Sequence, residues 1–125
     1  MAEIVIMGAL VMGALIALLE IFFVHADEAG MGWFKHAMHA APFAFVFVFI
    51  VMNVEYALEL VGLSWPAIAV QGAVALIALV KIQTAAAIAG KTGEKFTHTL
   101  IIALLILASP YVWDFVGPLL PSYLQ

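Results

Sequence analysis

The chain has 125 residues, of which 67% are hydrophobic and 10% are charged, and its mean hydropathy is +1.21. An ordinary soluble domain carries about 25% charged residues, so a water-soluble fold of this length could not bury so much apolar side chain. The formal net charge of −4 and the absence of arginine exclude a basic surface for nucleic acid. Because there is no cysteine, disulfides and thiolate metal sites are excluded as well.

Four apolar stretches are long enough to cross a hydrocarbon core of about 30 Å, which requires about 20 helical residues. In chain order they are Ile4 to Val24, Ala41 to Val61, Ala67 to Ala87 and Leu100 to Pro118. Each stretch greatly exceeds the roughly 10 residues of a membrane strand. The sequence therefore predicts an all-α integral membrane protein, with residues 1–125 forming a single domain of four antiparallel transmembrane helices.

Three short connections join these stretches, at residues 25–32, 62–66 and 90–95, and short links favour antiparallel neighbours. Lys35, Lys91 and Lys95 lie at the first and third connections, and the opposite side has no basic residue. The positive-inside rule then predicts that both termini lie outside, in a prokaryotic cytoplasmic membrane.

Residues 29–36 and 89–98 share a pattern of alanine, glycine, phenylalanine and histidine. The bundle could therefore have no internal symmetry, or it could consist of two helical hairpins related by a pseudo-twofold axis.

Two charged residues lie inside the apolar stretches at matching depths, Glu20 in the first and Lys81 in the third. A lone charge in a membrane helix costs about 2.5 to 3.5 kcal/mol, so such residues usually pair or face a cavity. Small residues share the helix face of Glu20, and others share the helix face of Lys81. Small residues allow helices to approach closely, which predicts that Glu20 and Lys81 meet, or nearly meet, where the first and third helices touch. The pair is either a structural ion pair or a proton- or cation-coupled site. Three polar residues that could extend such a site, or hold helices together, are Asn53, Glu55 and Gln71.

All four histidines, His25, His36, His39 and His98, fall near the same predicted interface. His36 and His39 are three residues apart and share a helix face, so their imidazoles could converge on one metal ion. His25, His98 or the neighbouring acidic residues 27 and 28 would complete the ligand shell. The alternative is that the histidines anchor the helix ends at the headgroups, since no established metal motif is present.

These features leave three functional hypotheses. The first is a non-catalytic subunit that packs in a larger membrane complex and stabilises it, with lipid and other membrane subunits as its partners. Aromatic residues typical of membrane interfaces support this hypothesis; they are Trp33, Trp65, Tyr111 and Trp113. The second is a metal-binding component of a membrane redox complex. An enzyme acting alone is not expected, because no nucleophile and base lie at a plausible spacing.

The third hypothesis is a small transporter or channel formed by identical copies of the chain, using Glu20 and Lys81. In length, span count and the first-helix Glu20, the chain resembles the small multidrug resistance transporters. Four short helices enclose little space, so an aqueous path would lie between identical copies of the chain. The resemblance does not extend to that family's aromatic-rich third helix, because residues 67–87 are nearly all small or aliphatic, and no site residue is carried across.

Overall fold

The computed structural model describes residues 1–28, 30, 32–89 and 94–125. The helices are α1 (Ile6–Asp27), α2 (Trp33–Met52), α3 (Val54–Leu60), α4 (Ala67–Ala89) and α5 (Phe96–Val116), followed by the short 3-10 turns η1 (Gly117–Leu119) and η2 (Ser122–Leu124). No strand occurs among the described residues. The prediction of an all-α chain is confirmed.

Four of these helices are long and apolar enough to cross a membrane: α1, α2, α4 and α5. Large apolar side chains cover the outside of the bundle, which a chain dissolved in water would not tolerate over so wide an area. Examples from three helices are Leu15, Leu18, Phe22, Leu76 and Leu104. These observations point to membrane localisation.

α2 extends beyond the predicted apolar stretch toward the N-terminus. It starts at Trp33, directly after the predicted connection at residues 25–32, whereas the apolar stretch begins at Ala41, so Lys35 and His36 are helical. Hydropathy registers only the apolar run, whereas backbone hydrogen bonding continues through polar residues back to Gly32. Pro42 lies inside α2, as membrane helices tolerate.

The second apolar stretch forms two helices instead of one. α2 stops at Met52, and α3 continues after Asn53 as far as Leu60. Gly62, at φ +70°, then terminates α3. The Gly62 amide donates to the Glu59 carbonyl at 3.1 Å, and the Leu63 amide donates to the Leu58 carbonyl at 2.9 Å. This Schellman arrangement requires a left-handed residue, which glycine supplies without strain.

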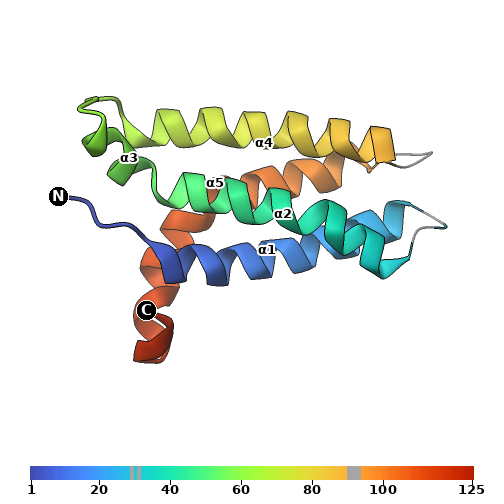
Figure 1. Cartoon of the computed structure of the whole chain (residues 1–125), viewed down its shortest axis with the longest axis horizontal. Coiled ribbons are helices and arrows are strands. Elements are labelled where there is room, and N and C mark those ends of the chain that lie inside the picture. The colour runs from blue at the N-terminus through green and yellow to red at the C-terminus, as the bar shows by residue number, and fades with distance from the viewer. Residues whose placement is uncertain (29, 31, 90–93) are drawn as a thin grey trace.

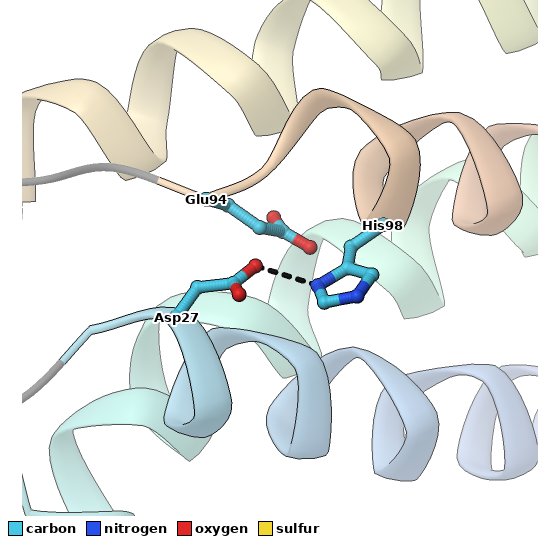
Figure 2. Close-up of side chains that lie close together, drawn as sticks. All are labelled: Asp27, Glu94 and His98. Atoms are coloured by element: carbon cyan, nitrogen blue, oxygen red, sulfur yellow. Dashed lines mark hydrogen bonds and ion pairs between the residues drawn. The ribbon is translucent and has the colours of Figure 1, made fainter.

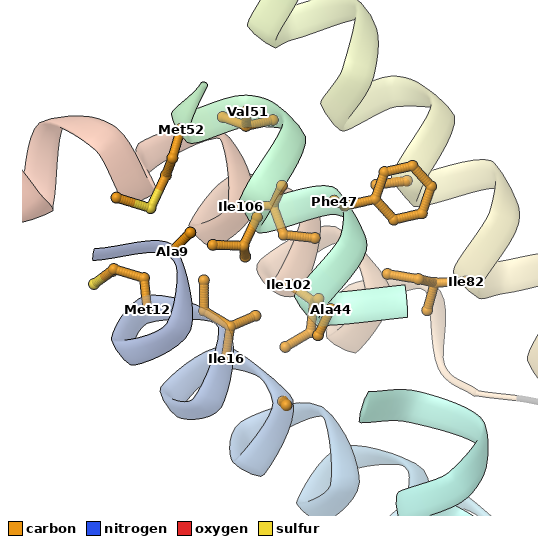
Figure 3. Close-up of a cluster of buried hydrophobic side chains, with 13 residues drawn as sticks. Ala9, Met12, Ile16, Ala44, Phe47, Val51, Met52, Ile82, Ile102 and Ile106 are labelled. Atoms are coloured by element: carbon orange, nitrogen blue, oxygen red, sulfur yellow. The ribbon is translucent and has the colours of Figure 1, made fainter. Parts of the chain in front are cut away.

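The core lies between α1, α2 and α5, with α4 packed against α2 and α5 (Figure 3). Its buried side chains come from all four long helices and include Ile16, Phe47, Val48, Ile82, Ile102 and Ile106. Gly8 allows close approach, because a Cβ atom there would lie 2.6 Å from the Trp113 ring. Trp113 belongs to the last part of α5, which follows Pro110 and runs at an angle to the rest of that helix (Figure 1).

The ends of α1 and α4 and the starts of α2 and α5 gather at one end of the bundle, opposite α3 and the N-terminus (Figure 1). We call it the histidine end, because all four histidines lie in the helical turns nearest to it. The predicted pseudo-twofold relation stays a prediction, because residues 29, 31 and 90–93 of the compared segments lie outside the described part of the chain.

Candidate metal centre

Asp27 joins the end of α1 to the start of α5. Its side chain is only 1% exposed. The Lys95 backbone amide donates to Asp27 Oδ2 at 2.9 Å, and Lys95 Nζ lies 3.4 Å from Oδ1. Lys95 is the N-cap residue of α5 and its own side chain makes no capping bond. A carboxylate from another helix therefore accepts a hydrogen bond from the exposed amide end of α5, where negative charge is stabilising.

His98 lies on the first turn of α5 and faces the same carboxylate. Its Nδ1 lies 2.6 Å from Asp27 Oδ2 (Figure 2). The imidazole also stacks on the Phe23 ring, with ring centroids 4.2 Å apart and planes 9° from parallel. The ring stacking and the short polar contact together fix the orientation of the imidazole toward Asp27.

Glu94 brings a second carboxyl group to this place. It lies four residues before His98, is 4% exposed, and neither side-chain oxygen has a hydrogen-bond partner of normal geometry in the described structure. Burial raises the pKa of Glu94 from 4.5 to about 7; Thr99 and His98 lower it in part, and the charge of Asp27 raises it further. Ionising a buried carboxyl group is costly, so this group favours a proton or a bound cation.

One ligand atom from each of Asp27, Glu94 and His98 can be chosen so that all three lie within 4.8 Å of one another (Figure 2). This arrangement offers one imidazole nitrogen and two carboxylate oxygens. Imidazole suits Zn²⁺, Fe²⁺ and related ions, and carboxylates add Mn²⁺ to the range. A bound ion would replace the proton that His98 shares with Asp27.

The predicted contact between Glu20 and Lys81 is wrong. Glu20 is 2% exposed, whereas Lys81 is exposed. α1 packs against α2 and α5, and α4 packs against α2, α3 and α5. The small residues near Glu20 and Lys81 therefore do not bring α1 and α4 together. Glu20 instead interacts with the Glu94 carboxyl group, without a hydrogen bond of normal geometry.

The four histidines do not converge on one point. His98 joins the acidic residues Asp27 and Glu94, while His25 and His36 face each other with their Nδ1 atoms 3.0 Å apart. His39 contacts Phe43 edge to face, with ring centroids 6.2 Å apart.

The remaining predicted polar residues lie at the opposite end of the bundle. Asn53 donates to the Val5 carbonyl at 3.2 Å and accepts from the Val5 amide at 2.6 Å. The Tyr111 hydroxyl donates to Gln71 Oε1 at 2.7 Å. Glu55 and Gln71 both line a cavity of about 320 Å³. These residues therefore do not extend a polar site around Glu20.

Sequence reasoning missed Glu94, although its spacing of four residues before His98 at the start of a helix was a usable signal. Asp27 was noted only as a residue that could complete a histidine site. Comparison of the chain with protein-family models, with curated proteins and with solved structures finds no match.

Proposed function

We propose that the protein binds a divalent transition-metal ion at the histidine end of an antiparallel membrane bundle. The observation that carries this proposal is the convergence of Asp27, Glu94 and His98 within 4.8 Å. Of the three functional hypotheses, the metal-binding one has this geometric support. The ligand set differs from the predicted one, because two of its three members are carboxylates.

Charge balance supports a divalent ion. Three buried carboxyl groups, those of Glu20, Asp27 and Glu94, share this region with one lysine ammonium, that of Lys95. In the metal-free chain the Glu94 carboxyl group holds a proton below about pH 7. If the carboxyl groups lose their protons on metal binding and His98 is a neutral ligand, they exceed the charge of Lys95 by two negative charges. Buried charges are retained when they are paired or coordinate metals, and one divalent ion supplies the missing two charges.

The test is a metal titration of the purified full chain in detergent after chelator treatment. Zn²⁺ and Mn²⁺ are the probes, and bound metal is measured at equilibrium. Glu94→Gln and His98→Ala should weaken Mn²⁺ binding more than about 100-fold, since even residues that only support metal ligands contribute 10- to 100-fold. Glu55→Gln, an exposed glutamate at the opposite end, should bind like the wild type. Wild-type affinity in both site variants would overturn the proposal.

Transport of the bound ion is a second candidate function, favoured by the position of Glu20. This carboxyl group lies two helical turns before Asp27 on α1 and interacts with Glu94. It therefore offers an acceptor deeper in the bundle than the three ligands. In vesicles that contain the protein, Glu20→Gln should abolish Mn²⁺ uptake while leaving binding at the histidine end. Mn²⁺ uptake by Glu20→Gln at the wild-type rate would show that Glu20 has no role in transport.

The predicted role as a subunit of a larger complex stays a prediction, and mass measurement of the intact particle after gentle extraction tests it.

We propose that the histidine end faces the cytoplasm, because Lys35 and Lys95 lie there. Protease accessibility of a terminal tag in oriented vesicles tests this orientation.

A further inference from the structure

A second group of metal-ligating side chains lies at the histidine end, between α1 and α2. His25 and His36 face each other with their Nδ1 atoms 3.0 Å apart. Their ring planes are inclined by 70°, with centroids separated by 5.1 Å. The two nitrogens are therefore close enough to share either a hydrogen or a metal ion.

The distance between the two nitrogens fits a shared ion. Metal-to-imidazole distances are about 2.0–2.1 Å, which places two ligands of one ion roughly 2.9 to 3.4 Å apart for angles between 90° and 109°. Without an ion, only one of the facing nitrogens can carry a hydrogen, so one tautomer of each ring is required.

The two rings are held in place by their surroundings. His25 stacks on Trp33, with ring centroids 3.7 Å apart and planes 19° from parallel. His36 is fully buried, at 0% exposure, and its Nε2 has no hydrogen-bond partner in the part of the chain that the structure describes. Such fixed rings need little reorganisation to bind an ion.

Glu28 brings a carboxyl group to the same end of α1. It is the C-cap residue of the helix, with an extended backbone (φ −109°, ψ 93°), so the helical repeat does not fix the direction of its side chain. It is 3% exposed, and neither carboxyl oxygen has a hydrogen-bond partner among the described residues. Its charge acts on His36. A buried carboxylate is retained when it is paired or coordinates a metal, and an ion held by the two imidazoles would supply that partner.

This group is separate from the ligands of the first centre. Successive helical residues are about 100° apart, so His25 and Asp27, which are two residues apart in α1, point to nearly opposite sides of the helix. Asp27 turns toward α5, where it meets His98. His25 turns toward α2, where it meets His36.

We propose that His25, His36 and Glu28 form a second metal site, with the Glu28 carboxylate turning toward the two Nδ1 atoms when the ion binds. Two imidazoles and one carboxylate favour Zn²⁺ and Cu²⁺ over the oxygen-preferring Mn²⁺. The chain then carries two sites of different donor sets on opposite sides of α1. The second site does not depend on the first.

Cu²⁺ binding to the purified full chain, followed by electron paramagnetic resonance, tests the proposal. Nitrogen hyperfine structure in the spectrum counts the imidazoles around each ion. The wild type should bind two ions per chain, one coordinated by two imidazole nitrogens and one by a single nitrogen. His25→Phe, which keeps an aromatic ring against Trp33, and the conservative Glu28→Gln should each weaken the two-nitrogen site at least 10-fold. His39→Ala is the matched histidine control and should keep both signals.

The two sites fail in distinguishable ways. Loss of the single-nitrogen signal in His98→Ala, with the two-nitrogen signal retained, supports two independent sites. A wild-type chain without a two-nitrogen signal, or an unchanged signal in both His25→Phe and Glu28→Gln, overturns the second site and leaves the first untouched. Helix content by circular dichroism, equal to that of the wild type, shows that each variant is folded.

Discussion

Asp27 Oδ2 lies 2.6 Å from His98 Nδ1, although the two residues are 71 positions apart in the chain. The same oxygen accepts the Lys95 backbone amide at 2.9 Å. One carboxylate thus caps α5, orients an imidazole and joins the end of α1 to α5. Its structural role and its proposed metal-binding role can be separated by mutation.

Asp27→Asn keeps an oxygen that can accept the Lys95 amide, whereas Asp27→Ala removes it. Loss of a cap costs about 1 kcal/mol, so the alanine variant should unfold at a lower temperature than the asparagine variant. Both should lose Mn²⁺ binding at the site of Asp27, Glu94 and His98, because neither supplies a carboxylate. Thermal unfolding without metal and a Mn²⁺ titration measure the two effects. Asp114→Asn, at an exposed position, is the control, and equal stability of the two Asp27 variants would refute the capping role.

The raised pKa of Glu94 predicts a pH dependence of stability in the chelator-treated protein. Between pH 4.5, the ordinary pKa, and about 7, the folded chain holds a proton on Glu94 that the unfolded chain has lost. The free energy of unfolding should therefore fall as pH rises through this window and level off above it. Glu94→Gln should flatten this part of the profile, while Glu55→Gln should not. Parallel profiles for the wild type and Glu94→Gln would contradict the prediction.

Two glycine-to-alanine substitutions should change stability in opposite directions. At Gly8 a Cβ atom would lie 2.6 Å from the Trp113 ring, whereas at Gly72 nothing lies within 4 Å. Gly8→Ala should destabilise the chain by about 1–3 kcal/mol through overpacking. Gly72→Ala should stabilise it by about 0.5–1 kcal/mol, because glycine is a poor helix former. Thermal unfolding in one detergent compares them, and a shift of the same sign in both would count against the packing of α1 on Trp113.

Asn53 should contribute strongly to the stability of the end opposite the metal centre. It makes two hydrogen bonds with the Val5 backbone and donates a third to the Phe49 carbonyl at 2.8 Å. Asn53→Ala leaves these groups unpaired, at about 1–3 kcal/mol. Asn53→Asp keeps the acceptor for the Val5 amide and should fall between the alanine variant and the wild type. Hydrogen exchange at Val5, faster in the alanine variant, is the direct measurement; unchanged exchange would argue against the contact.

A double-mutant cycle tests the separation of Glu20 from Lys81. Because Lys81 is exposed on α4 and Glu20 is buried against α5, Glu20→Gln and Lys81→Leu should act independently. Their effects on the free energy of unfolding should add within about 0.5 kcal/mol. A coupling energy well above this value would show that Glu20 and Lys81 form an ion pair, contrary to the packing of α1 and α4.

Local features of the chain could be predicted from the sequence with good success. The apolar runs predict four helices of membrane length, and the turn at Gly62 ends α3 as expected. The start of α2 at Trp33 agrees with the predicted connection at residues 25–32. It differs from the start of the apolar stretch at Ala41, since hydropathy follows side chains while the helix follows backbone hydrogen bonds. The small residues beside Glu20 and Lys81 are compatible with any close helix contact and do not specify the partner helix.

The sequence by itself determined the class of the chain, because the apolar content of a run of about 20 residues is a local property that needs no knowledge of its neighbours. It also placed all four histidines near one end. Only the tertiary structure decided which groups meet there: Glu94 and Asp27 with His98, and His25 with His36. Those distances depend on which face each helix turns toward the next, and packing of the whole bundle sets that rotation.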